Sequence, residues 1–226
     1  KAFKAPSLKQ LSLDYITVAA GGRFIITGNP DLKPETSTAY EAGASWYGKG
    51  WQLGATLFQS DLHGLVQTIC VEQCGVRGRE RRAYVNVDRA RIRGVELNGA
   101  WNPAESLSLS ASYTYVDPRN LGTGQELAER PNHSVKGMVG WTFLPGSTVN
   151  LRGRYVGAQT VIQNNVPVRL DGYDLWSLDL SHRLTERVTL KAGVDNIFRK
   201  RLSEDSALYT YAEPGRIFFV GLGAGF

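Results

Sequence analysis

Within residues 105–116, "ESLSLSASYTYV", apolar and polar residues alternate strictly from Ser106 to Tyr115. One parity of this run contains Leu107, Leu109, Ala111, Tyr113 and Tyr115, and the other contains only serines and a threonine. A two-residue period predicts a β-strand with two different faces. In a soluble sheet the leucines would face a core, whereas in a membrane barrel they would face lipid and the serines would line a wet interior.

The same period recurs along the chain and predicts nine strands, with the end of a tenth at residues 1–5. The predicted strands are residues 40–47, 51–58, 95–101, 105–116, 135–143, 149–155, 176–181, 188–195 and 218–226. Their connections alternate in length, and this order bears on the architecture. The short turns lie near residues 49, 103, 146 and 185, and the long connections span 63–82, 117–131, 158–172 and 201–213. Outer-membrane barrels have this asymmetry, with short periplasmic turns and long external loops.

Charged residues on the polar parity favour the membrane alternative. Arg152, Arg154, Lys136, Lys191, Asp179, Asp195 and Glu96 occupy that parity. Such charges are costly against lipid and are tolerated in a water-filled lumen. Trp46, Trp51, Trp101, Trp141 and Phe143 lie near the short turns on the opposite parity, as the aromatic girdle of a barrel does. We therefore predict an all-β fold, a transmembrane antiparallel up-and-down β-barrel, with a soluble barrel or sandwich as the alternative.

Composition excludes other classes. The chain has 226 residues and no apolar run near the 18 to 20 residues of a membrane helix. Its opening residues lack the apolar segment of a signal peptide. Seven arginines and two acidic residues between Arg77 and Arg93 give a local net charge of +5, equal to that of the whole chain. Such a local cluster indicates one anion-attracting element, and we expect no nucleic-acid partner.

Five stretches together resemble the later barrel strands of TonB-dependent outer-membrane receptors. They are "FKAPSLKQL" (residues 3–11), "GNPDLKPETSTAYEAG" (28–43), "NVDRARIRGVEL" (86–97), "VDNIFRKR" (194–201) and "PGRIFFVGLGAGF" (214–226). The resemblance implies that residues 1–226 are the C-terminal part of a barrel of about 22 strands in a Gram-negative outer membrane. It also implies a plug domain and earlier strands outside this sequence, and energy supplied through that plug by TonB with ExbB and ExbD.

The last predicted strand resembles the terminal strand by which such proteins are recognised for insertion. Phe218, Val220, Leu222 and Phe226 would form that insertion signal.

Cys70 and Cys74 lie in the first long connection, which would be external. Two cysteines in an oxidising compartment, without further nearby Cys or His ligands, favour a disulfide over a metal site. Because the closed loop is short, we expect little stabilisation of the barrel.

The predicted cargo follows from the resemblance and from positive charge near the external side. Haem receptors of this family are similar in placing a ligating His between the "F-x-A-P" and "N-P-x-L" stretches, and residues 5–29 contain no His. Guanidinium groups and aromatic rings suit an anionic, flat-faced ferric siderophore of the catecholate kind. The candidate ligand-binding residues are Arg77, Arg79, Arg81, Arg82, Arg152, Arg154, Tyr209 and Tyr211.

Several alternatives stay open. Haem, cobalamin or a passive diffusion porin are the alternatives to siderophore import, and a solvated loop is the plain alternative for the arginines at 77–82. Arg89, Arg91 and Arg93 share the parity of Val95 and Leu97, which would place them against lipopolysaccharide phosphates. A phage or bacteriocin is a possible further partner. No catalytic constellation, metal site or resident cofactor is predicted, and iron would be carried only as the siderophore complex.

Overall fold

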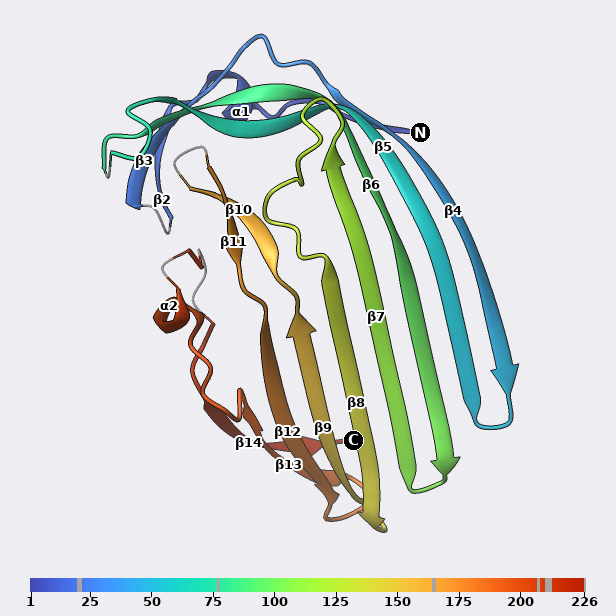
Figure 1. Ribbon diagram of the computed structural model, residues 1–226. Helices are drawn as coiled ribbons and strands as arrows, with labels where there is room; N and C mark the ends of the chain where they lie inside the picture. The colour runs from blue at the N-terminus through green and yellow to red at the C-terminus, as the bar shows by residue number, and fades with distance from the viewer. Residues whose placement is uncertain (20–21, 77, 164–165, 207, 210–212, 226) are drawn as a thin grey trace.

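The computed structural model describes the chain except residues 20–21, 77, 164–165, 207, 210–212 and 226. Ten strands follow one another side by side in a single curved antiparallel sheet, in the order β1-β4-β5-β6-β7-β8-β9-β12-β13-β14 (Figure 1). Their bounds are β1 (Ala2–Lys4), β4 (Glu35–Gly48), β5 (Trp51–Glu72), β6 (Arg81–Ala104), β7 (Leu107–Asn120), β8 (His133–Leu144), β9 (Ser147–Val156), β12 (Tyr173–Arg183), β13 (Val188–Asp195) and β14 (Ile217–Ala224). All nine sequence-predicted strands are present, and β1 is the tenth.

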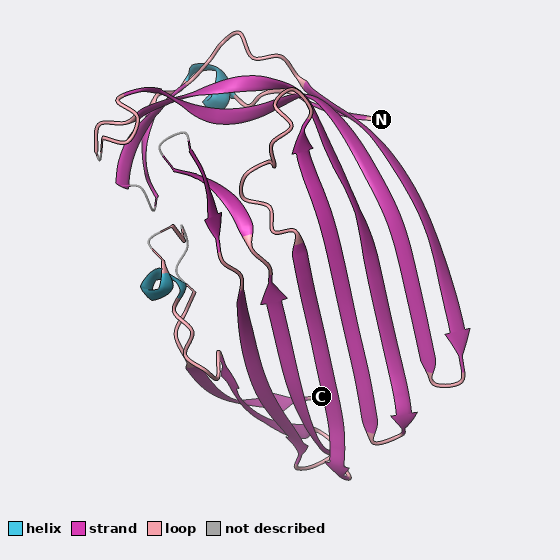
Figure 2. Ribbon diagram, viewed as in Figure 1, coloured by secondary structure: helices cyan, strands magenta, loops and turns pink. Residues whose placement is uncertain are grey.

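The short turns lie together at one end of the sheet, as the sequence predicts (Figure 2). Lys49 and Gly50 join β4 to β5, and Pro145 and Gly146 join β8 to β9. Both glycines have positive φ, +79° and +77°, a conformation that tight turns require and that glycine adopts without a Cβ penalty.

The strand register fixes which residues share a face. Leu109 pairs with Val139, Val139 with Leu151, and Leu151 with Leu178, so these apolar side chains form one row across four strands. The alternate row joins Ser110 to Met138 and Met138 to Arg152. Cross-strand partners in a sheet point to the same face. The apolar and polar parities of the sequence are therefore the two faces of one wall.

The external ends of the strands differ from the sequence prediction. The connection expected over residues 63–82 is mostly strand, because β5 continues to Glu72 and β6 begins at Arg81. Residues 158–172 contain the hairpin β10 (Gln159–Gln163) and β11 (Val166–Leu170), and residues 201–213 contain helix α2 (Leu202–Asp205). Alternation marks the lipid-facing parts of strands, and these extensions lie beyond them.

The N-terminal segment also folds onto the outer ends of the long strands. Helix α1 (Leu8–Ser12) begins with a capping box between Ser7 and Gln10. It is followed by the hairpin β2 (Tyr15–Ala19) and β3 (Gly22–Thr27), and β3 pairs in parallel with β6. The hydroxyls of Tyr15 and Tyr84 are 2.6 Å apart. In Figure 1 these elements lie at the top, where β5 and β6 bend over the end of the sheet.

Hydrophobic cores occur only where loops cover the sheet in the described part of the chain. One cluster contains Val161, Leu170, Tyr173, Leu202 and Tyr209, and a second contains Leu65, Ala90 and Leu127. Most other large apolar side chains are exposed, including Leu57, Phe218 and Val220. No helix in the described residues is long and apolar enough to cross a membrane.

Candidate ligand-binding wall and external loops

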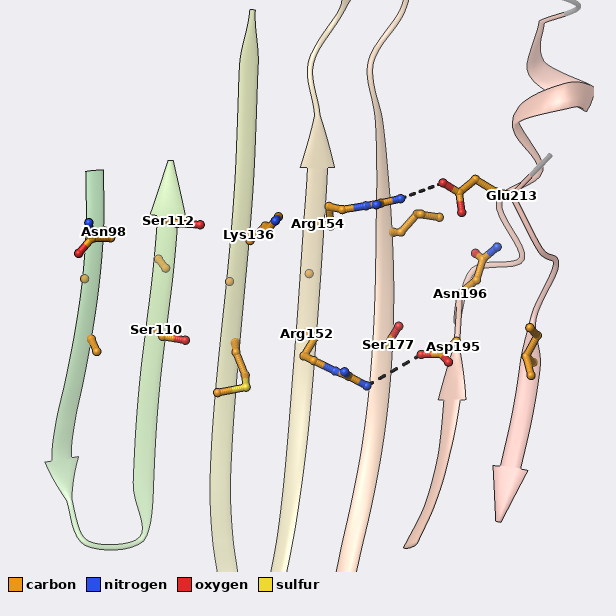
Figure 3. A pocket seen from close by; sticks show the side chains of 18 of the residues that line it. Asn98, Ser110, Ser112, Lys136, Arg152, Arg154, Ser177, Asp195, Asn196 and Glu213 are labelled. Atoms are coloured by element: carbon orange, nitrogen blue, oxygen red, sulfur yellow. Dashed lines mark hydrogen bonds and ion pairs between the residues drawn. The ribbon is translucent and has the colours of Figure 1, made fainter. Parts of the chain in front are cut away.

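A concave pocket of about 690 Å³ lies on the polar face of the sheet and is lined by residues from β5 to β14 (Figure 3). We call this surface the lumenal wall. Its floor is made by alternate residues of neighbouring strands, and the segment before β14 closes one side. The polar residues that line it are Gln52, Asn98, Ser110, Ser112, Lys136, Arg152, Arg154, Ser177, Asp195, Asn196 and Glu213.

Arg152 is held by carboxylates of the neighbouring strands. Its Nη2 lies 2.8 Å from Asp179 Oδ1 on β12 and 3.9 Å from Asp195 Oδ1 on β13. Asn150 donates a hydrogen bond from Nδ2 to the other oxygen of Asp179 at 2.8 Å. This arrangement neutralises Arg152 within the wall.

Arg154 stands one row nearer the external loops and has a different partner. Its Nη2 donates to Glu213 Oε1 at 2.8 Å, and Glu213 comes from the connection between β13 and β14 (Figure 3). Arg154 is also the cross-strand partner of Lys136. Lys136 is exposed and makes no ion pair with any residue that the structure describes. Glu213 is one carboxylate beside two cations, Lys136 and Arg154, so it leaves one positive charge uncompensated in this part of the pocket lining.

The connection that carries Glu213 is organised by Asn196. This buried residue adopts a positive φ of 53° and donates from Nδ2 to the carbonyl oxygens of Lys200 and Pro214, at 2.8 and 2.9 Å. Its Oδ1 accepts from the Lys200 backbone N–H. The hydrogen bond to Asp205 raises the pKa of Lys200 above its usual value. Asn196 and Glu213 were not among the predicted site residues, although "DNIF" offers Asn as a tolerant residue for a left-handed turn.

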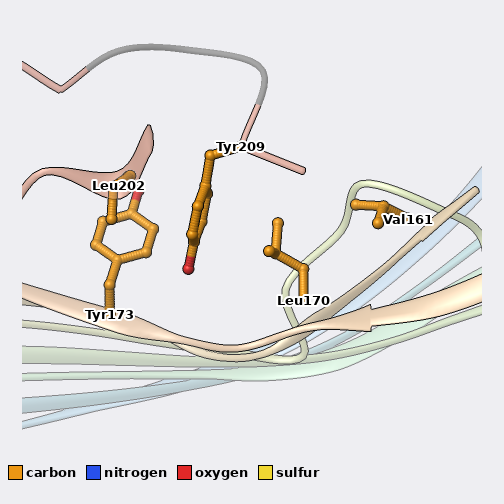
Figure 4. Close-up of a cluster of buried hydrophobic side chains, with 5 residues drawn as sticks. All are labelled: Val161, Leu170, Tyr173, Leu202 and Tyr209. Carbon is orange, nitrogen blue, oxygen red and sulfur yellow. The ribbon is translucent and has the colours of Figure 1, made fainter. Parts of the chain in front are cut away.

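Tyr209 lies within the first hydrophobic cluster (Figure 4). Its ring meets Tyr173 edge-on at 5.9 Å between centroids, and its hydroxyl donates to the carbonyl of Asp171 at 2.6 Å. The side chain is 8% exposed, so its observed surroundings are those of a packing residue. Tyr211, the other predicted aromatic residue, lies outside the described residues.

The predicted arginine cluster lies at the β5–β6 hairpin. Arg81 and Arg82 are in β6 and not in a loop, which corrects the expected placement. Arg82 Nε donates to buried Glu80 at 2.7 Å, and its guanidinium lies 4.2 Å from the centroid of the Phe24 ring. Arg81 is 3.7 Å from Glu72, and Arg79 is exposed in the hairpin turn. Arg77 lies outside the described residues, so the cluster is partly neutralised and partly free to attract anions.

Cys70 and Cys74 form a disulfide at the tip of this hairpin, as predicted. Cys70 is the antiparallel partner of Arg82 and Glu72 of Arg81, so the bridge closes a short loop at the outer end of the β5–β6 pairing.

The predicted insertion residues lie on the last strand. Phe218, Val220 and Leu222 of β14 are each more than 70% exposed, on the face that carries the other apolar rows. Phe226 lies outside the described residues. Exposure on this face fits contact with lipid, and the role of the strand as an insertion signal stays a prediction.

The histidines do not form a ligand set on the lumenal wall. His63, His133 and His182 share cross-strand rows with Arg89, Tyr115 and Leu190 on the apolar parity. No group of three or more His, Cys, Asp or Glu side chains is placed to hold a metal ion among the residues described.

Comparison with known proteins places this wall in a family. A family model described as "TonB dependent receptor-like, beta-barrel" matches residues 1–197. A ferric enterobactin receptor of Pseudomonas aeruginosa is 28% identical over 251 residues, covering all of this chain and 34% of that protein. The ferrienterobactin receptor of Escherichia coli is 26% identical over 262 residues, covering 100% of this chain and 35% of that protein.

Solved structures of outer-membrane receptors and transporters are also similar to this chain. A mutant ferric enterobactin receptor from Pseudomonas aeruginosa in complex with enterobactin superposes with a TM-score of 0.76 at 26% identity, covering 100% of this chain and 37% of that chain. A copper transporter, OprC, shares the fold at a TM-score of 0.72 and 23% identity over 87% of this chain and 32% of that chain. The fold alone therefore does not choose a cargo.

The chain spans about a third of the length of the curated relatives it matches. TonB-dependent receptors are outer-membrane transporters of Gram-negative bacteria rather than enzymes. The family model matches most of the chain, and the structure is a curved antiparallel wall with an apolar and a polar face. This chain therefore belongs to the TonB-dependent receptor family and forms part of its outer-membrane β-barrel.

Proposed function

We propose that the protein containing this chain binds a ferric siderophore from outside the cell and imports it through the outer membrane. The cargo is of the catecholate class, whose ferric complexes are anionic. The relatives named as ferric enterobactin receptors align with the whole chain, which supports this class. Import draws energy from TonB with ExbB and ExbD, through a plug domain of the kind that the family resemblance implies.

The observation that carries the proposal is the uncompensated positive charge at Lys136 and Arg154 in the pocket lining. Lys136 and Arg154 are cross-strand neighbours on the lumenal face, below the external loops. Glu213 pairs with Arg154 and leaves Lys136 without a carboxylate among the described residues. An anionic ligand that reaches this wall supplies the counter-charge, and lysine and arginine at such a concave site raise its local concentration.

The test is uptake of radioactive iron as a catecholate complex by cells that make the full-length receptor. The double variant Lys136→Gln, Arg154→Gln should lower initial uptake about tenfold at limiting ligand, because each lost charge weakens attraction and pairing. Lys191→Gln is the matched control, since Lys191 is a lumenal cation close to the short turns. Uptake unchanged in the double variant, or lowered equally in the control, contradicts the role of the wall.

The energy source is tested in the same cells. Uptake should disappear in a strain that lacks TonB, and uptake that persists there contradicts energised import. Conductance separates the porin alternative, because a plugged receptor should be nearly closed in a planar bilayer and a porin open. Haem and cobalamin are tested as competitors of the radioactive complex, and competition by either at concentrations near its own affinity contradicts the siderophore assignment.

The hairpin arginines provide a second, long-range attraction in this proposal. Neutralising Arg77, Arg79, Arg81 and Arg82 together should weaken cargo binding at low salt. The loss should shrink as ionic strength rises, because the Debye length falls from about 30 Å at 0.01 M to about 8 Å at 0.15 M. Equal loss at every ionic strength would instead indicate a change in the hairpin itself.

A further inference from the structure

A second group of arginines lies on the opposite face of the sheet from the lumenal wall, in the middle of β6 and at the external end of β7. Asp61 pairs with Arg91 and Arg91 with Arg119 across β5, β6 and β7. In the next row toward the membrane, Gln59 pairs with Arg93 and Arg93 with Asp117. These residues share the face of Leu57 and Val95, which is the lipid-facing side of the wall. We call Arg89, Arg91, Arg93 and Arg119 the outer basic patch.

Carboxylates contact three of the four guanidinium groups of this patch, and one of these contacts is Glu126 Oε1 at 3.8 Å from Arg119 Nη2. Asp61 Oδ1 accepts from Arg91 Nε at 2.6 Å. Asp117 Oδ2 accepts from Nε and Nη2 of Arg93, at 3.1 and 3.0 Å, and its Oδ1 accepts from Arg119 Nε at 2.6 Å. Each guanidinium has five N–H donors, so most donors remain available. The carboxylates therefore orient the arginines without using up their hydrogen-bonding capacity.

The arginine side chains stay open to the surroundings. The exposed fractions are 39% for Arg91, 61% for Arg93 and 45% for Arg119. Arg89 makes no ion pair among the residues that the structure describes. Arginine forks that are oriented and exposed match the oxygens of a phosphate group, which accept two parallel hydrogen bonds.

An apolar groove begins directly below the patch. It has a volume of about 540 Å³, and Arg93, Asp117 and Gln59 line its upper end. Tyr40, Leu57, Val95 and Tyr115 line the remainder of its outward side. Leu57 and Tyr40 are at least 60% exposed. Basic groups at one end of an apolar groove fit a ligand with a phosphorylated head and a hydrocarbon tail.

We propose that the outer basic patch and this groove bind a phosphorylated glycolipid of the outer leaflet, with lipopolysaccharide as the source. Its phosphate groups contact Arg89, Arg91 and Arg93, and an acyl chain lies against Leu57 and Val95. The patch lies on the lipid-facing side of the sheet, away from the short turns and at the outer end of β7, which is the side of the membrane that this leaflet occupies. A second copy of the chain would bring another set of arginines to the patch, so charge complementarity favours the lipid. The proposal does not depend on the identity of the cargo.

The experiment is native mass spectrometry of the full-length receptor in detergent, titrated with bisphosphorylated lipid A or with the same lipid after removal of both phosphates. Wild-type receptor should bind the bisphosphorylated lipid about tenfold more tightly or better. This comparison needs no variant, so it stays informative whatever a substitution does to folding. Equal binding of the two lipids, or a dimer of the receptor in place of the lipid complex, overturns the proposal.

Variants then locate the site. The triple variant Arg89→Gln, Arg91→Gln, Arg93→Gln should lose the preference for the phosphorylated lipid, and the corresponding triple lysine variant should recover part of it because the charge returns. Arg187→Gln is the control, since Arg187 lies in the connection between β12 and β13 at the other end of the sheet. Heat-dependent migration on gels checks that each variant is folded. A preference retained in the triple variant, or lost equally in the control, places the lipid elsewhere and contradicts the assignment.

Discussion

The part of the sheet that spans the membrane, which we call the membrane band, places hydrophobic residues on its outer surface, whereas the external loops bury them. In the band, Leu109, Val139 and Leu151 lie in a row on the outer surface, and the polar row faces inward. Above the band, Leu202 and Tyr209 are buried beneath loops and polar groups face outward. The solvent explains the difference, because hydrocarbon surrounds the band and water surrounds the loops. The same chain therefore carries apolar residues on the outside in the membrane band and beneath the surface in the external loops.

The largest expected effect tests the hydrophobic cluster beneath the external loops. Leu202 is 0% exposed in the cluster with Val161, Leu170, Tyr173 and Tyr209. Leu202→Ala should destabilise the external loops locally by about 2 to 5 kcal/mol, the usual range for a buried Leu→Ala change. Hydrogen exchange should quicken in β10, β11 and residues 196–206 while β7 and β8 stay protected. Equal loss of protection in β7 would show that loops and band unfold as one unit.

The second prediction tests which face of the membrane band contacts lipid. Leu109→Arg places a charge on the lipid-facing row and should destabilise the barrel by about 2 to 4 kcal/mol near the midplane. Ser110→Arg, one residue away on the lumenal row, should cost far less. Denaturant unfolding of the receptor in vesicles measures both. If the two variants are equally stable, or if water-soluble thiol reagents label Leu109→Cys but not Ser110→Cys, the assignment of faces is wrong.

The third prediction concerns one hydrogen bond in the loop core. Tyr209→Phe removes the donor to the Asp171 carbonyl and should cost about 0.5 to 1.5 kcal/mol of local stability. Exchange of backbone amides in β11 should quicken modestly, less than in Leu202→Ala. If amide exchange in β11 is unchanged and the affinity for the ligand is lost, the Tyr209 hydroxyl instead has a role in binding.

The smallest expected effect belongs to the disulfide. Replacing Cys70 and Cys74 with serine should leave the unfolding of the barrel unchanged within about 0.5 kcal/mol, because the closed loop is short and lies beyond the band. Only exchange at the tip of the β5–β6 hairpin should increase. A large loss of barrel stability would show that the hairpin supports the band.

The sequence by itself determined the band. Period-two alternation, aromatic residues next to short turns and charges such as Arg152 on the polar parity fixed the strands and their faces, because side-chain direction in a strand alternates regardless of its neighbours. The cysteine pair indicated a disulfide for an equally local reason. Position in the sequence also gave Arg154 and Lys136 a common face.

Only the tertiary structure decided what happens beyond the band. Glu213 lies 59 residues from Arg154 in sequence and forms its ion pair, and Tyr209 packs in a hydrophobic cluster with Tyr173 and Leu202. Arg82 of the hairpin similarly lies over the ring of Phe24, which comes from the N-terminal hairpin. Such contacts depend on how separate loops fold back over the sheet, and no periodic pattern records that packing, because in water a loop buries whichever apolar side chains its neighbours bring to it.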